Sequence, residues 1–225
     1  MNSNEEHFEN ILQKLTTISA LKQDNYRNIK RVFKELMEIS ETLMGKLKEK
    51  TPDLDKEVEI EFTKVNEFEF HVKLSGDILV FVLQTNIVTL NPAHPVMQSE
   101  HVKSDPSRGY FGHIMIYNFL SDSIRYNRLH DPGYLVARIM VNHENNFFVE
   151  GVRQMNFLFT DLAGNTINSQ WLELILEKSI ITAMEIDLIA PNYPDIQNVT
   201  LSQKINNESR MGRGEKIGFQ MSAMD

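Results

Sequence analysis

The most regular alternation in the chain covers residues 57–74, which read EVEIEFTKVNEFEFHVKL. Nearly all the large apolar side chains of this stretch occupy even positions, and most of the charged ones occupy odd positions. A period of two residues is typical of half-buried β-strands. A three-residue turn at 65–67 would place Phe62 opposite Phe70, with both side chains on the core face. The pattern therefore predicts an antiparallel hairpin.

The chain continues with apolar segments that are separated by polar connections. A wholly apolar stretch such as 78–83 predicts a strand that is covered on both faces. The strands predicted after the hairpin are residues 78–83, 87–90, 110–120, 134–142 and 147–160. Residues 91–109 contain few apolar side chains, so we expect a long loop there. Together these segments predict an antiparallel sheet of about six to eight strands.

Residues 4–50 predict a long helix, because they contain no proline and no glycine before Gly45. Its apolar residues follow each other at intervals of three and four, the spacing of a coiled-coil seam. They are Phe8, Ile11, Leu15, Ile18, Ile29, Val32, Leu36, Ile39 and Leu43. Lys22 and Asn25 interrupt this series, so the segment forms either one rod with a polar layer or two helices in an antiparallel hairpin. We favour the unbroken rod because no turn residue marks a break.

Residues 169–189 predict a second long helix, with Asn168 or Ser169 as its N-cap. Apolar side chains cover most of its circumference, so we expect it to be buried across one face of the sheet. The fold class predicted is therefore α+β. We expect a helical oligomerisation segment at 1–56, an α+β domain at 57–203 and a flexible tail at 204–225.

The composition argues against several classes of protein. The chain has 31 acidic and 23 basic residues, a net charge of -8, which argues against a general nucleic-acid-binding surface. It has no cysteine, so disulfides, thiolate metal sites and cysteine nucleophiles are excluded. Neither a secretion signal nor an apolar run long enough to cross a membrane is present. We therefore expect a cytoplasmic protein that does not bind membranes.

The middle of the chain contains arginine but no lysine. All five basic residues between 104 and 177 are arginines, namely Arg108, Arg125, Arg128, Arg138 and Arg153. Guanidinium groups bind phosphate or carboxylate through two hydrogen bonds, and aromatic rings can stack on a base. We therefore consider an anion or nucleotide site within residues 104–153. Its candidate ligand-binding residues are Arg125, Arg128, Arg138, Arg153, His113, Tyr110 and Tyr134.

Internal ion pairs are the alternative explanation for these arginines, because the same segment carries five acidic residues. Arg153 gives the sharpest expectation. In a regular strand it would share the core face with Met155 and Phe159, and a buried arginine needs a carboxylate or a ligand as partner. A bulge at Gly151 would instead turn Arg153 outward.

Histidines offer a second kind of site. A metal centre that activates water would need several histidine and carboxylate ligands close together. The candidates are His94, His101, His113, His130, His143, Asp122, Asp131 and Glu144. Their spacing matches no established ligand pattern, and exposed histidines in loops are the alternative. The sequence contains no phosphate loop, no nucleophile elbow and no metalloprotease motif.

Three functions remain as hypotheses. The first is a non-catalytic, intracellular adaptor or assembly protein that forms homo-oligomers, such as a homodimer, through the N-terminal helix and that could also bind another protein. The second is a sensor that binds an anionic ligand or nucleotide through residues 104–153. The third is a metal-dependent hydrolase. The N-terminal seam favours the first, because it must be covered either by a second copy or by the protein's own sheet.

Overall fold

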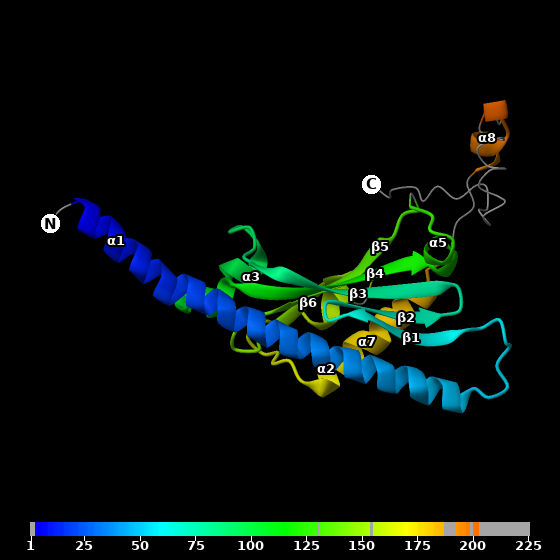
Figure 1. Ribbon diagram of the computed structural model, residues 1–225, viewed down its shortest axis with the longest axis horizontal. Helices are drawn as coiled ribbons and strands as arrows, with labels where there is room; N and C mark the ends of the chain where they lie inside the picture. The colour runs from blue at the N-terminus through cyan, green and yellow to red at the C-terminus, as the bar shows by residue number, and fades with distance from the viewer. Residues whose placement is uncertain (1–2, 130, 154, 187–191, 199, 203–225) are drawn as a thin grey trace.

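The protein is described here by a computed structural model, which covers residues 3–129, 131–153, 155–186, 192–198 and 200–202. The predicted tail at 204–225 and His130 lie outside these residues. The N-terminal part forms one continuous rod, consisting of α1 (Ser3–Lys14), the π-helical turn η1 (Leu15–Ser19) and α2 (Ala20–Lys50). The predicted unbroken helix is thus confirmed, and Figure 1 shows that α1 extends well past the end of the sheet.

Within the described residues, the sheet has six strands in the order of the sequence, each antiparallel to the next. They are β1 (Ile60–Asn66), β2 (Glu69–Leu74), β3 (Asp77–Val88), β4 (Phe111–Leu120), β5 (Tyr134–Val141) and β6 (Phe147–Gly151). This confirms the predicted α+β class. The segments predicted as separate strands at 78–83 and 87–90 both belong to β3, whose pairing with β4 shifts between Gln84 and Val88.

The first hairpin has the predicted core face but not the predicted register. Phe62 lies opposite Val72, and Lys64 lies opposite Phe70. The pairing then shifts so that Asn66 lies opposite Glu69, which leaves Val65 in a bulge. The extra residue of the bulge permits a two-residue turn while keeping the apolar side chains on one face.

The main core lies between one face of the sheet and two helices, α2 and α7 (Ser169–Met184). Figure 1 shows both helices on the same side of the sheet. Its fully buried residues include Ile29, Phe33 and Leu36 of α2, Phe70, Phe81, Ile114 and Ile139 of the sheet, and Leu172, Ile175 and Leu176 of α7. The second half of the predicted seam is therefore covered by the protein's own sheet. Asn25 is also buried, and its Nδ2 donates to the Leu21 carbonyl at 3.1 Å.

The N-terminus of α7 agrees with the prediction, because the Asn168 side chain accepts a hydrogen bond from the Trp171 N–H at 3.0 Å. This bond satisfies one of the free amides of the first turn. The helix ends at Met184, before the expected Ile189.

The connection at 91–109 is not the long loop that the sequence predicts. It contains α3 (Pro95–Gln98), α4 (Glu100–Ser104) and the 3₁₀ turn η2 (Pro106–Gly109). Val96 and Val102 of this connection pack against Phe111, Met140 and Phe148. These contacts form a smaller core on the face of the sheet opposite α2 and α7. We call this second face the open face, since the helices of the main core do not cover it.

The predicted strand at 147–160 is wrong beyond Gly151, where β6 ends and the short helix α6 (Met155–Leu158) follows. Arg153 adopts a left-handed conformation, with φ of 52°. A Cβ at position 151 would lie 2.8 Å from the Val136 carbonyl oxygen, so the chain passes too close to β5 for a larger residue. The turn directs Arg153 to an exposed position rather than into the core. Two other short helices, α5 (Ser121–Arg125) and α8 (Tyr193–Ile196), lie outside the main core.

We predict that Gly112→Ala lowers the free energy of unfolding by about 1–3 kcal/mol, as overpacking of a core does. The added Cβ would lie 2.5 Å from the Cβ of Ile29, an atom that cannot move unless α2 moves. Denaturant unfolding measures the effect. Gly45→Ala is the matched control, because nothing lies within 4 Å of its added Cβ, and it should stabilise α2 by about 0.5–1 kcal/mol. Equal effects at the two positions would contradict the prediction.

Candidate functional site

The seven residues predicted to bind an anion do not form one site. His113 and Arg138 are diagonal neighbours on β4 and β5, since His113 lies opposite Met140 and Met115 lies opposite Arg138. Arg125 and Arg128 both lie near the ring of Tyr126, with their guanidinium carbons 5.6 and 5.7 Å from its centroid. Tyr134 and Arg153 are near each other, since burial raises the pKa of Tyr134 and the charge of Arg153 opposes this rise, and Tyr110 lies against Lys22.

Arg138 shares its carboxylate partner with a histidine of the 91–109 connection. Its Nε donates to Glu150 Oε2 at 2.7 Å, and Glu150 Oε1 lies 3.1 Å from His94 Nε2. His94 Nδ1 accepts from the Val96 N–H at 3.2 Å, so the ring proton sits on Nε2 and is donated to Glu150. Glu150 therefore neutralises Arg138 and also holds the connection against β6.

His113 lies on the open face, diagonally next to Arg138. Burial, and next the charge of Arg138, lower the pKa of His113 below its ordinary value. His113 is therefore more readily neutral than an exposed histidine is, which weakens it as a partner for an anion.

Arg128 and Arg153 also lie near acids. Arg128 NH1 is 3.6 Å from Asp131 Oδ2, an oxygen that accepts a hydrogen bond from the Ser123 hydroxyl at 2.6 Å. Arg153 NH1 donates to Glu185 Oε2 at 3.1 Å. Arg108, which belongs to the same arginine segment, makes two bonds to Glu144, at 2.9 and 3.3 Å. The Arg108 and Arg128 pairs correspond to the ion pairs within the segment that the sequence left as the alternative, whereas the partner of Arg153, Glu185, lies outside that segment.

The two tyrosines have separate surroundings. Tyr110 lies under Lys22, whose Nζ is 5.6 Å from the ring centroid. The Tyr134 hydroxyl accepts from Asn118 Nδ2 at 2.7 Å, and the same amide nitrogen donates to Asp77 Oδ1 at 2.8 Å. Burial raises the pKa values of both Asp77 and Tyr134. This cluster is a partly buried polar network at the ends of three strands.

The histidines and carboxylates do not assemble a metal centre in the part of the chain that the structure describes. No group of three or more such residues there has the geometry to hold a metal ion. His94 is hydrogen-bonded to Glu150, and His113 lies on the open face of the sheet.

The most distinctive surface lies on the N-terminal rod. Phe8, Ile11, Leu12 and Leu15 are exposed by 63, 58, 45 and 57 %, and we call these four residues the N-terminal stripe. Their spacing of i, i+3, i+4 and i+7 puts them on one face of the helix. Every side chain from residue 5 to residue 20 is exposed. The stripe therefore contributes nothing to the core of its own chain.

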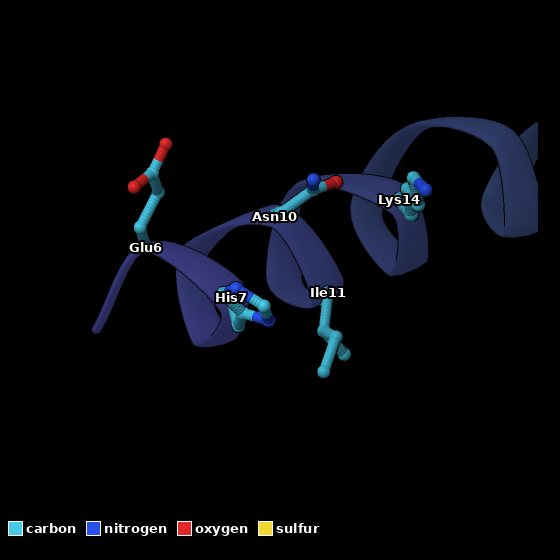
Figure 2. Close-up of a pocket in the computed structure, with 5 residues that line it drawn as sticks. All are labelled: Glu6, His7, Asn10, Ile11 and Lys14. Carbon is cyan, nitrogen blue, oxygen red and sulfur yellow. The ribbon is translucent and has the colours of Figure 1, made fainter. Parts of the chain in front are cut away.

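A shallow hollow lies along the same helix and is drawn in Figure 2. All five residues that line it belong to α1: Glu6, His7, Asn10, Ile11 and Lys14. Figure 2 shows Ile11 on one side of the helix and Glu6 and Asn10 on the other. A hollow walled by a single helix cannot enclose a small molecule, so α1 is better suited to contact with another helix.

The sequence reasoning missed the π-helical turn η1 and the membership of Leu12 in the stripe. The Ala20 N–H donates to the Leu15 carbonyl, five residues back. Thr16 Oγ1 bonds to the Leu12 carbonyl at 2.9 Å, and Thr17 Oγ1 bonds to the Gln13 carbonyl at 2.7 Å. These hydroxyls satisfy carbonyls that the wider turn displaces. Two adjacent threonines within a long helix were the signal that could have indicated it.

Comparisons with known proteins supply no further assignment. No protein-family model matches the chain, and neither a curated protein nor a solved structure matches it. Among the described residues, no helix has both the length and the apolar content needed to span a membrane.

We predict that Asp77→Asn is more stable than the wild type at neutral pH. At about pH 3.5, near the ordinary pKa of an aspartate, this advantage should be smaller. Because burial raises the pKa of Asp77, the folded chain holds this proton more tightly than the unfolded chain does. The stability that protonated Asp77 contributes is therefore present at low pH and is lost as the pH rises through its ordinary pKa towards the raised one. Thermal unfolding across this range measures the difference.

Asp53→Asn is the control, because residue 53 is exposed in a connection. It should change stability by the same small amount at both pH values. A difference between Asp77→Asn and the wild type that does not vary with pH would contradict the prediction.

Proposed function

We propose that the protein is a non-catalytic assembly or adaptor protein that associates with a second copy of itself through its N-terminal helix. The observation that carries the proposal is the N-terminal stripe, four large apolar side chains on one face of a helix that extends beyond the folded body (Figure 1). An apolar face of this kind is typical of a surface that another helix covers. The self-associating segment would be residues 3–21, because residues 25–44 are committed to the core.

The size of the stripe favours a reversible association. Burying a large apolar side chain completely is worth roughly 1.5–3 kcal/mol, and the stripe side chains are about half covered already. The eight side chains of two copies would therefore contribute about 8 kcal/mol, whereas association costs about 4–15 kcal/mol in lost freedom. Because these two values are similar, we expect a dimer that depends on protein concentration.

The two alternative functions have less support. The anion sensor needs arginines that are available to a ligand, but Arg128, Arg138 and Arg153 lie against carboxylates. The hydrolase needs a metal or a nucleophile arrangement, and the described residues offer no metal cluster. We place the assembly protein in the cytoplasm, a proposal that rests on the cysteine-free composition.

We predict that Ile11→Ser combined with Leu15→Ser raises the dissociation constant of the dimer at least tenfold. The substitutions remove two of the four stripe side chains from each copy, and both sites are exposed in the single chain. The thermal stability of the body should not change. Sedimentation velocity over a range of concentrations measures the association.

Asn10→Ser combined with Gln13→Ser is the matched control. It introduces two serines into the same part of the N-terminal rod, so the loss of helix propensity is similar. This control should associate like the wild type. A wild-type chain that stays monomeric at every concentration would contradict the proposal, and so would equal association of the two double variants.

Positions in the second half of the seam cannot serve for this test. Leu36 belongs to the same three-and-four series as the N-terminal residues but is completely buried against the sheet. A polar residue there would unfold the body, and a loss of association would then say nothing about the helix surface.

A further inference from the structure

The spacing of the four residues of the N-terminal stripe along the sequence is symmetric. The four residues follow at intervals of three, one and three positions. If two copies run antiparallel, Phe8 of each lies opposite Leu15 of the other, and Ile11 lies opposite Leu12. Each stripe side chain then meets an apolar side chain, with a two-fold axis between residues 11 and 12, whereas Ile18, which is 40 % exposed, lies opposite Glu5.

Charge along the rod also distinguishes the two directions of pairing. The N-terminal end is acidic, with Glu5, Glu6 and Glu9, and the basic residues Lys14 and Lys22 follow. Parallel pairing in register would bring the three glutamates of one copy against the same three of the other. Antiparallel pairing separates these glutamates and places Glu9 at the level of Lys14 of the partner, with Glu5 and Glu6 at the level of Ile18 and Thr17.

The π-helical turn η1 determines which side of the rod carries the stripe. At 100° per residue, an unbroken α-helix would place the stripe within about 40° of the middle of the buried face of α2. The turn takes up one extra residue, which rotates α1 by about 100° further from that face. The stripe therefore faces outward, on the side of the exposed residues Gln23 and Arg27.

The outward side is also the unobstructed one. On the side facing the body, Lys22 already lies over the ring of Tyr110, the residue that follows η2. A second helix on that side would approach Tyr110. On the outer side, the α2 residues Gln23 and Arg27 are exposed.

We propose that two copies pair antiparallel through the outward-facing stripe, with their sheets at opposite ends of the paired helices. This inference rests on the proposed self-association. It adds the relative direction of the two helices and the face of α1 through which they pair. The π turn is the positioning element, because it separates the stripe that binds a second copy from the stripe that packs on the sheet.

Distances between spin labels in the dimer test the direction of pairing. The chain has no cysteine, so Asn10→Cys and Gln23→Cys each introduce one labelling site, and both positions are exposed. Asn10 lies close to the expected two-fold axis. In an antiparallel dimer the two Gln23 labels are about 35 Å apart along the helix, at about 1.5 Å per residue. The two Asn10 labels are about 5 Å apart along the helix, so the axial separation is about 30 Å greater for Gln23, and the measured distance should be longer for Gln23 than for Asn10.

Each other outcome overturns a defined part of the account. A distance that does not increase from Asn10 to Gln23 would overturn the antiparallel direction but leave self-association intact. If neither label shows a distance between copies at any concentration, self-association itself fails. The labelled chains with Ile11→Ser and Leu15→Ser added should lose both distances, and their persistence would show that copies meet through another surface.

Discussion

The close contact between Ile29 of α2 and Gly112 of β4 sets the position of the N-terminal rod. A side chain at position 112 would leave no room for Ile29, so the helix lies directly on the backbone of the sheet. Two hydrogen bonds hold the same part of the helix to the β5–β6 turn, from Asn28 to the Asn142 carbonyl and from Arg31 to Asn145. Because α2 is anchored in this way, the continuous helix carries α1 past the sheet in a fixed direction.

The sequence predicted the helices and the faces of the strands better than their details, because burial periodicity is a local property. The alternation at 57–74 identified the core face correctly, but the register depended on a bulge at Val65 that the pattern could not show. The apolar residues beyond Gly151 resembled a strand, although the close approach of β5 turns the chain there. The sequence likewise gave no sign that 91–109 would fold over Phe111.

The candidate sites were harder to predict because they depend on contacts between distant residues. The arginine segment was evident, but the carboxylate that each arginine meets is set by the tertiary fold, as the pair Arg153–Glu185 shows. The seam of the N-terminal helix was predicted as one feature. The structure divides it, because α2 is long enough to cross the sheet and α1 extends past it (Figure 1). The π turn then separates the faces of the two parts.

α1 is the end of the rod and its described side chains are exposed, so its protection from local opening should depend on what covers its apolar face. Hydrogen exchange of the backbone amides of residues 5–20, measured at increasing protein concentration, therefore tests the central claim most directly. We expect protection of these amides to rise with concentration, while that of residues 29–44 stays constant. If residues 5–20 exchange at one rate at every concentration, the stripe is not covered by a second copy, and the account is wrong.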